Sequence, residues 1–486
     1  MSKPRSVKSK ASVSRQKRRI LWELRQRRGE KGSGPLRKQV LPNRKSPLQT
    51  VEEEQAERQR AVEEQLKVLR PLLPRLLRQF AKIPDPRNPQ TTKHKLTTLL
   101  LYGLLWFVFR MSSRREANRQ MSQPEFQKNL RDAFPELETV PHQDTVNRLL
   151  SRIPVDQIGL ALVELTRRLI RSKKLRRYLA GQHYAIAIDG TQKWMSNRGW
   201  APECLQRHRE KEQTQYYVYV LEADLIFPNG LTLPLMSEFL KRSDGDVAKA
   251  KQDCELKAFR RLAQRLKACF PHLPVIVVLD GLYPNAPVIQ LCRKYHWQFM
   301  IVLRDGCLPS AWEEFHALQR LLPEQVLDQP WGNRQQHFTW VNGIEHDDWV
   351  QRRGHRVTVH IVVCEEYWKE QDARTGQTVQ KTARHAWVSS EPLRKSNVHL
   401  RCNLIARHRW GIENHILVEK HHGYQYEHCF SLDWNAMQGF HHLMRLAHAL
   451  NSLVQWSAAL AGIVTALGAR GFIQFMRTTF PALGWT

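Results

Sequence analysis

Apolar residues recur with helical spacing in the first part of the chain. Glu52 to Phe80 begins as a charged stretch and becomes amphipathic, and Val155 to Leu179 repeats the helical pattern. Between them, Leu96 to Phe109 is a continuous apolar run. As a helix this run would span about 21 Å, short of the roughly 30 Å hydrocarbon core of a bilayer. The pattern therefore predicts a helical domain with a buried central helix that does not span a membrane.

Three short helices are predicted between these long ones, at Arg114–Met121, Glu125–Phe134 and Thr145–Ile153. Asp144 or Thr145 can cap the third of them. Arginine and asparagine near the starts of such helices would suit a helix-turn-helix reader of DNA. Ordinary helical packing explains the same pattern at least as well, so the sequence leaves both interpretations open.

From residue 183 the spacing of apolar residues becomes that of strands. Predicted strands cover 183–189, 216–227, 231–239, 274–280 and 297–303, and predicted helices cover 246–270 and 287–295. Asn229-Gly230 indicates a hairpin between the second and third strands. The fully apolar fourth strand is typical of the centre of a parallel sheet. This order predicts an α/β fold, a mixed five-stranded sheet with helices on both faces.

The next segment is rich in strand-like stretches, which begin at Gln336, Arg356 and Arg384. Its Trp331, Trp340 and Trp349 would suit base stacking or, more simply, core packing. A long apolar helix follows from Ala436 to about Ala461. The predicted organisation is a flexible basic arm (1–55), a helical DNA-binding domain (56–180), the α/β core in two parts (181–304 and 401–460), a β-rich insertion between them (305–400), and a partly helical tail (461–486).

The net positive charge of the chain limits the kinds of molecule that it is expected to bind. The formal net charge is +30, and the first 50 residues hold 16 basic and two acidic side chains. Such a segment cannot bury enough apolar surface to fold alone, so a flexible arm is expected, either contacting DNA or only solvating the chain. The basic balance favours nucleic acid or an anionic membrane. The eight cysteines form no CxxC pair, which argues against a zinc ribbon and fits a reducing cytoplasm.

Two aspartates stand where predicted strands end. Asp189 and Asp280 each follow an apolar strand directly, and each precedes a glycine. One such Asp-Gly is usually a turn residue. In an open α/β sheet, however, ligand sites gather at the carboxyl ends of strands, and the first and fourth strands can be neighbours there. Two adjacent carboxylates repel unless a divalent cation lies between them, and oxygen ligands favour Mg²⁺ or Mn²⁺.

A third carboxylate lies in a predicted helix at residues 407–420. Arg409, Glu413 and Lys420 have the spacing i, i+4 and i+11, which places them on one helix face. This group is either a surface salt bridge or part of a site for a metal and a phosphodiester. His421 and His422 would extend a cationic rim around Glu413. Histidines 415, 421, 422, 428, 441 and 442 lack an HExxH spacing, so zinc is disfavoured.

These residues carry a resemblance to a known family. The chain resembles the DDE transposases of bacterial insertion sequences whose third acid lies in a Tyr-x2-Arg-x3-Glu-x6-Lys signature. Arg409, Glu413 and Lys420 match that signature, while its tyrosine position is Ala406. Asp189 and Asp280 match the other two acids. Asp85-Pro-Arg and Trp410-Gly-Ile-Glu-Asn are also similar to related transposases.

The resemblance implies an RNase H-like core that cuts DNA at element ends and performs strand transfer with Mg²⁺, for which Mn²⁺ can substitute. Asp189, Asp280 and Glu413 would be the catalytic, metal-binding acids, and Arg409 and Lys420 would bind DNA. The implied partner is double-stranded DNA at terminal repeats and target. By the same analogy we expect a homodimer on paired ends, in the bacterial cytoplasm with the nucleoid and without a membrane.

Two other functions remain compatible with the sequence. A transposase-derived DNA-binding protein without catalysis would retain the acids only for packing, and Ala406 in place of the signature tyrosine keeps this hypothesis open. An RNase H-like nuclease without strand transfer would use the same acids. The DNA ends, the target preference, and a cut-and-paste or replicative route are not encoded in any motif that we can read.

Overall fold

The computed structural model describes residues 48, 50–208, 214–242, 253–348, 355–371 and 376–482 of the chain. Most of the predicted basic arm and Trp349 lie outside these residues. The described chain forms two compact units. The larger comprises the residues up to 283 together with 291–298 and 404–482, and the smaller comprises 284–290 and 299–403. Each unit is considered separately below.

The larger unit begins with seven helices among its described residues, where the sequence predicted six. They are α2 (Val51–Leu69), α3 (Leu73–Phe80), α4 (Leu96–Val108), α5 (Arg114–Met121), α6 (Pro124–Ala133), α7 (Gln143–Leu150) and α8 (Asp156–Arg171). The single helix predicted for 52–80 is wrong. It is divided after Leu69, because Pro71 and Pro74 cannot continue a hydrogen-bonded helix.

Two predicted helix boundaries in this region also need correction. The cap of α7 is His142, whose ring accepts a hydrogen bond from the backbone of Asp144, and neither Asp144 nor Thr145 takes that role. Helix α8 ends at Arg171 and not at Leu179, since Lys173 adopts a left-handed backbone with φ of 59°. A left-handed residue cannot continue a right-handed helix.

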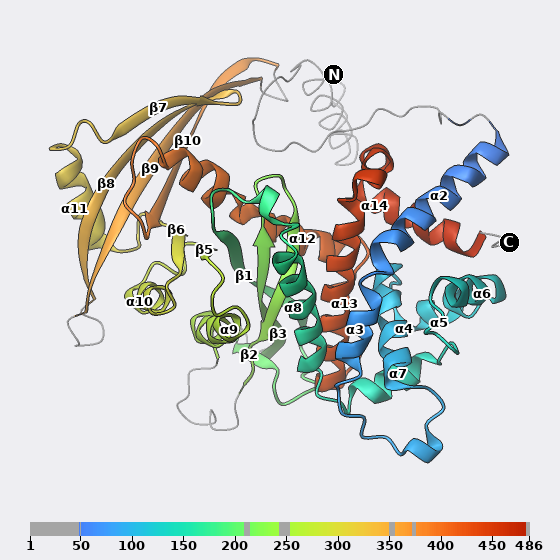
Figure 1. The fold of residues 1–486 in the computed structure, drawn as a ribbon. Helices are drawn as coiled ribbons and strands as arrows, with labels where there is room; N and C mark the ends of the chain where they lie inside the picture. The colour runs from blue at the N-terminus through green and yellow to red at the C-terminus, as the bar shows by residue number, and fades with distance from the viewer. Residues whose placement is uncertain are drawn as a thin grey trace, which may run out of the picture. The chain divides into compact units, whose positions relative to one another are not determined.

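One hydrophobic core joins these helices to the end of the chain. Helix α4 is buried along its whole length, as its apolar run predicts. It packs against α13 (Trp434–Gln455), which also contacts α2, α7 and α8. Figure 1 shows α13 between α8, which lies on the side of the strands, and the helices α3 and α4. The helix that follows the α/β segment is thus part of the helical core.

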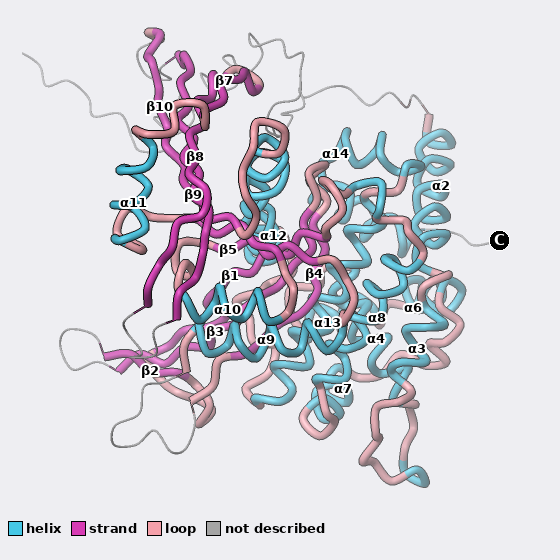
Figure 2. Tube along the Cα trace, turned by 60° about the vertical axis from the view of Figure 1, so that its left-hand side comes forward, coloured by secondary structure: helices cyan, strands magenta, loops and turns pink. Residues whose placement is uncertain are grey.

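The strands of the larger unit form a mixed sheet, which confirms the α/β class. They are β1 (Tyr184–Ser196), β2 (Leu205–His208), β3 (Thr214–Ile226), β4 (Thr232–Phe239) and β5 (Val275–Leu279). Their order is β2-β3-β1-β5, with β4 also paired to β3. Strands β1 and β5 are parallel, while β3 pairs antiparallel with β1, β2 and β4. Figure 2 shows this sheet and the helices around it.

Two features of this sheet differ from prediction. Strand β2 was not expected. Strand β1 does not end at Asp189 but continues to Ser196, because antiparallel pairing with β3 extends beyond the point where β5 stops. The Asn229-Gly230 hairpin between β3 and β4 is confirmed, and Gly230 has the positive φ of 92° that such turns require.

Helices lie on both sides of β1 and β3 (Figure 1), with α9 (Glu255–Cys269) on one side and α8 and α13 on the other. Helix α9 begins at Glu255. The predicted helix 246–270 is wrong for residues 253–254, which are described and are not helical. Its predicted start at residue 246 lies outside the described residues. Helix α12 (Trp410–His421) contacts β1, β3 and β4.

The smaller unit contains the predicted β-rich segment. Its strands are β6 (Gln298–Val302), β7 (Val326–Trp331), β8 (Arg334–Asp348), β9 (His355–Gln371) and β10 (Thr378–Ser389), paired antiparallel in the order β6-β10-β9-β8-β7. Helix α11 (Pro309–Gln319) was not predicted. Helix α10 (Ala286–Lys294) precedes β6. The prediction of a five-stranded sheet missed that β6 pairs with β10, a strand of the β-rich segment. Trp340 is buried in the core, which favours packing over base stacking for this residue.

The chain ends in α14 (Ala461–Thr479), where Gly468 introduces a kink with φ of 70°. Among the described residues, the segment Ala458–Thr479 is long and apolar enough to cross a membrane by length and composition, and 22% of its apolar window is buried. Core helices of soluble proteins pass the same test, so this helix carries no conclusion about a membrane.

Candidate active site

The two predicted aspartates lie side by side. Strands β1 and β5 pair in parallel from Tyr184 opposite Val275 to Ala187 opposite Val278, so that the same register continued by two residues places Asp189 opposite Asp280. Each carboxylate accepts a hydrogen bond from a backbone N–H that follows it in the chain. Gly190 donates to Asp189 Oδ1 at 3.1 Å, and Leu282 donates to Asp280 Oδ1 at 2.9 Å. The prediction that the first and fourth strands are neighbours is thus confirmed.

The third predicted acid is close to the first. Burial raises the pKa of Asp189 to about 7, and the negative charges of Glu413 and Asp280 act in the same direction. The guanidinium of Arg409 opposes them. The charges of Glu413, Asp280 and Arg409 are therefore close enough to act on the Asp189 carboxylate. The tertiary structure therefore brings Asp189, Asp280 and Glu413 together.

Arg409 and Glu413 form the predicted i, i+4 pair, with Arg409 Nη2 at 2.5 Å from Glu413 Oε1. The segment is not one helix from residue 407, however. A 3₁₀ segment, Ala406–Arg409, precedes α12 and contacts β5. Arg409 is 7% exposed, and within the described chain its buried Nη1 has no hydrogen-bond partner. This nitrogen is a donor positioned for an anionic group.

Lys420 is in the last turn of α12, the helix that carries Glu413, and it forms an ion pair with Glu427, at 3.1 Å between Lys420 Nζ and Glu427 Oε1. Of the cationic rim expected around Glu413, the structure shows the contact with Arg409, and the role of Lys420 toward DNA stays a prediction.

An open cavity of about 740 Å³ adjoins the Lys420–Glu427 pair. Its wall includes Arg114 and Arg115 at the start of α5, Trp194 of β1, and Glu427 itself. Arg114 pairs with Asp144 at 3.5 Å. Basic and aromatic side chains in one cavity are suited to a nucleic-acid strand. Arg114 and Arg115 come from one of the short helices for which the sequence left both DNA reading and ordinary packing open.

Sequence reasoning missed a fourth carboxylate near these acids. Glu255, the first residue of α9, also acts on the pKa of Asp189 and raises it. It fell inside a longer predicted helix, where an acidic residue carries no signal of a site. An apolar periodicity that starts only after Glu255 was the available sign that the helix begins there.

Comparison with known families adds one finding. Residues 77–165 match the sequence model of the family described as DDE_Tnp_1-associated. The chain is related to DDE-family transposases. The matched residues run from the second half of α3 to α8, so this transposase relationship rests on the helical part and not on the acids. No curated protein matches the chain.

Beneath the acids of this transposase-related protein, a buried charge network holds α12 against the sheet. Its centre is Arg445 of α13, fully buried, whose guanidinium contacts Glu222 and Asp224 of β3 and Glu419 of α12. Arg445 Nη1 donates to both carboxylate oxygens of Glu419, at 2.9 and 3.1 Å. Helix α12 thereby has a fixed position relative to β3, the neighbour of the strand that carries Asp189.

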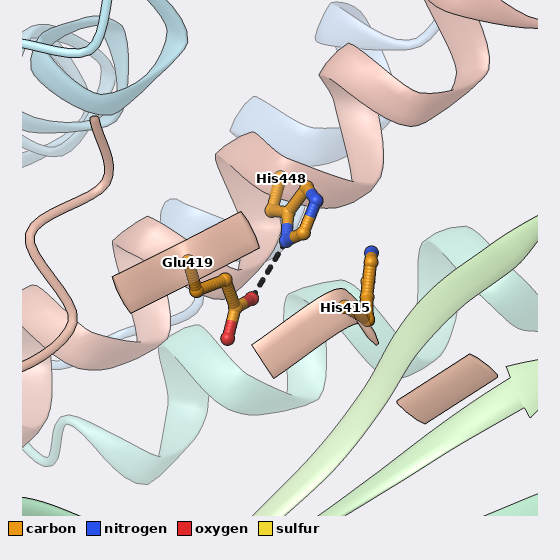
Figure 3. A group of neighbouring side chains, drawn as sticks. All are labelled: His415, Glu419 and His448. Carbon is orange, nitrogen blue, oxygen red and sulfur yellow. Dashed lines mark hydrogen bonds and ion pairs between the residues drawn. The ribbon is translucent and has the colours of Figure 1, made fainter. Parts of the chain in front are cut away.

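His415 and His448 complete the buried charge network (Figure 3). His448 Nδ1 lies 2.7 Å from Glu419 Oε1, and His415 Nδ1 lies 2.6 Å from Asp224 Oδ2. Ligand atoms of His415, Glu419 and His448 lie within 4.8 Å of one another. The two imidazole rings, however, are stacked with centroids 3.8 Å apart, so their in-plane lone pairs do not converge on one point. Because Arg445 also occupies both oxygens of Glu419, we interpret the group as an ion-pair network.

Proposed function

We propose that this protein is a metal-dependent DNA transposase with an RNase H-like core, which cuts phosphodiester bonds at the ends of a transposable element and joins them to target DNA. The observation that carries the proposal is the convergence of Asp189, Asp280 and Glu413 beside the buried, half-satisfied guanidinium of Arg409. The family match of residues 77–165 supports it independently.

The donor set fits a hard divalent cation. Asp189, Asp280 and Glu413 offer only carboxylate oxygens, the ligands that Mg²⁺ prefers and Mn²⁺ accepts. Bound cations would activate a water or 3′-hydroxyl and stabilise the leaving oxygen. The chain's own part is to hold the three carboxylates in place through β1, β5 and α12. Arg409 Nη1 is aimed to donate to a phosphodiester oxygen, and Lys420 would exchange Glu427 for a flanking phosphate.

The same proposal specifies the partner and the setting. Double-stranded DNA, at element terminal repeats and target, would lie along the basic surface that includes Arg114 and Arg115. We expect two copies of the chain on paired ends, in the bacterial cytoplasm with the nucleoid. The net charge of +30 supports a polyanionic partner.

The test uses supercoiled DNA that carries the sequences flanking the gene, incubated with purified protein and Mg²⁺ or with a chelator. Glu413→Gln removes one charge and little volume, so we expect cleavage to fall by at least about a thousandfold, the scale of a lost charge-stabilising group. Binding of the DNA in a gel-shift assay should survive. Glu164→Gln, in a pair with Arg167 on α8, is the matched control and should cut normally. Cleavage by Glu413→Gln at the wild-type rate would contradict the assignment of Glu413 to the active site.

Two alternatives are separated by the products of the same reaction. Tight binding without any cutting by the wild-type protein would favour the catalytically silent DNA-binding protein. That hypothesis has one structural observation in its favour, because Ala406, at the signature tyrosine position, is a buried residue at the start of the 3₁₀ segment. Cutting without joined products would favour the nuclease.

A further inference from the structure

We infer that Glu255 is a fourth cation-binding carboxylate of this site, held in place by two tyrosines and by the glycine that follows Asp189. The inference rests on the proposed function, and it adds a residue that neither the signature nor the family match contains. Four observations on the described residues carry it.

The first observation is the contact with β1. Gly190 directly follows Asp189, and a Cβ atom added to it would lie 2.5 Å from Glu255 Oε2. The same added atom would lie 2.6 Å from the Tyr219 ring. Since real Cβ atoms do not approach other atoms so closely, only glycine allows the Glu255 carboxylate to lie directly against the strand that carries Asp189.

The second observation is the way in which the carboxylate is held. Tyr283 donates its hydroxyl to Glu255 Oε1 at 2.6 Å, and Tyr219 donates to Oε2 at 3.1 Å. Tyr283 follows Asp280 by three residues, and Tyr219 lies on β3 opposite Gln192 of β1. Glu255 is thus connected to the segment that follows β5 and to β3, the neighbour of β1. Each carboxylate oxygen still has a second lone pair available for a ligand.

The third observation is the balance of charge. Burial raises the pKa of Glu255, the two tyrosine hydrogen bonds oppose this, and the charge of Asp280 raises it further. The contact with Gly190 and the hydrogen bond from Tyr283 place the Glu255 carboxylate close to the residues that follow Asp189 and Asp280. Carboxylates so close together are stabilised by a cation.

The fourth observation is Arg409. It is more than nine-tenths buried and points at Glu413, yet its Nη1 has no partner within the described chain. The carboxylates of Glu413, Asp189, Asp280 and Glu255 would stabilise a divalent cation, and Nη1 would donate to an anion, which is the combination that a metal-bound phosphodiester supplies.

The test measures binding of MnCl₂ to the full chain at pH 7.5 by calorimetry, in the absence of DNA. Glu255→Gln should weaken Mn²⁺ binding by roughly 10- to 100-fold, the loss typical of a disrupted metal site. Glu238→Gln is the matched control. Its carboxylate pairs with Arg261 and Arg265 on the outer side of α9, so Mn²⁺ binding should equal that of the wild type. Glu255→Asp retracts the carboxylate and keeps its charge, and it should weaken binding as well.

Asp189→Asn distinguishes a failure of the inference about Glu255 from a failure of the proposed function. If Asp189→Asn loses Mn²⁺ binding while Glu255→Gln and Glu255→Asp bind as the wild type does, the inference about Glu255 is wrong and the proposed function stands. If Asp189→Asn also binds Mn²⁺ normally, the proposed metal site itself fails. Should Glu255→Gln not fold, as judged by its circular dichroism, the result for Glu255→Asp decides.

Discussion

At the scale of single residues, Asp189 is held in a form that resists ionisation. Its pKa is raised to about 7 by burial and by the neighbouring carboxylates, against an ordinary value of 3.8. The folded protein thus binds this proton more tightly than the unfolded chain does. The stability that the group contributes is complete below pH 3.8 and is lost as the pH rises through about 7.

Asp189→Asn should therefore stabilise the cation-free protein at alkaline pH. At pH 8 the ionised wild-type side chain costs on the order of 2 kcal/mol after allowance for solvent screening, and asparagine carries no such cost. At pH 5, nearer the unfolded value of 3.8, the difference in unfolding temperature should be less than half of that at pH 8. Thermal unfolding in a chelator at both pH values measures the difference.

Asp132→Asn, at an exposed position on α6, controls for the substitution itself and should leave the melting temperature unchanged at either pH. Adding Mn²⁺ at pH 8 should raise the melting temperature of the wild type and not that of Asp189→Asn. A stabilisation by Asp189→Asn as large at pH 5 as at pH 8 would show that charge is not its cause.

At the scale of elements, the position of α12 depends on the buried charge network. Arg445 is the shared partner of Glu222, Asp224 and Glu419, which come from β3 and α12. Burial raises the pKa of Glu419 to about 8 even though Arg445 opposes the shift. The pKa of Glu222 is lowered, because Arg445 and His441 outweigh its burial. Removing the one guanidinium would leave three carboxylates in the core.

We expect Arg445→Met to lower the free energy of unfolding by about 3 to 5 kcal/mol, the cost of breaking a buried ion pair from one side. Urea unfolding followed by far-ultraviolet circular dichroism measures it. Lys67→Met, at an exposed pair with Glu64 on α2, is the control and should leave the midpoint unchanged. An unchanged midpoint for Arg445→Met would mean that the network does not hold α12.

The elements also show where sequence patterns suffice. Helix α4 and the β3–β4 hairpin formed as predicted, because burial of an apolar run and the Asn229-Gly230 turn are decided locally. The single helix expected for 52–80 is interrupted at Pro71. This break follows from a local rule, the inability of proline to continue a helix, that the prediction did not apply. The predicted end of β1 was wrong for a different reason. The length of β1 is set by its pairing with β3, a strand that lies further along the chain.

At the scale of the whole molecule, charge is the dominant property. The net charge of +30 includes 16 basic residues among the first 50, which lie almost entirely outside the described residues. If this arm contacts DNA, each phosphate that it neutralises adds about 0.9 to the steepness with which affinity falls with salt.

Deleting residues 1–47 should therefore make the salt dependence shallower by roughly 3 or more in log–log slope. Titration of one labelled DNA duplex at several NaCl concentrations, with full-length and truncated protein, measures both slopes. Cleavage by the truncated protein at low salt is the control, because the site lies in the rest of the chain. Identical slopes would mean that the arm only solvates the protein.

The sequence by itself determined the α/β class and the Arg409–Glu413 pair, and it predicted Asp189, Asp280 and Glu413 as the acids of a site. These follow from periodicity, from the position of an acid after an apolar run, and from the geometry of one helical turn. Only the tertiary structure placed Lys420 with Glu427, gathered Arg445 with three buried acids, and brought Glu255 against Gly190. Those contacts join segments far apart in the chain, and no local pattern encodes which distant side chains will share one low-dielectric space.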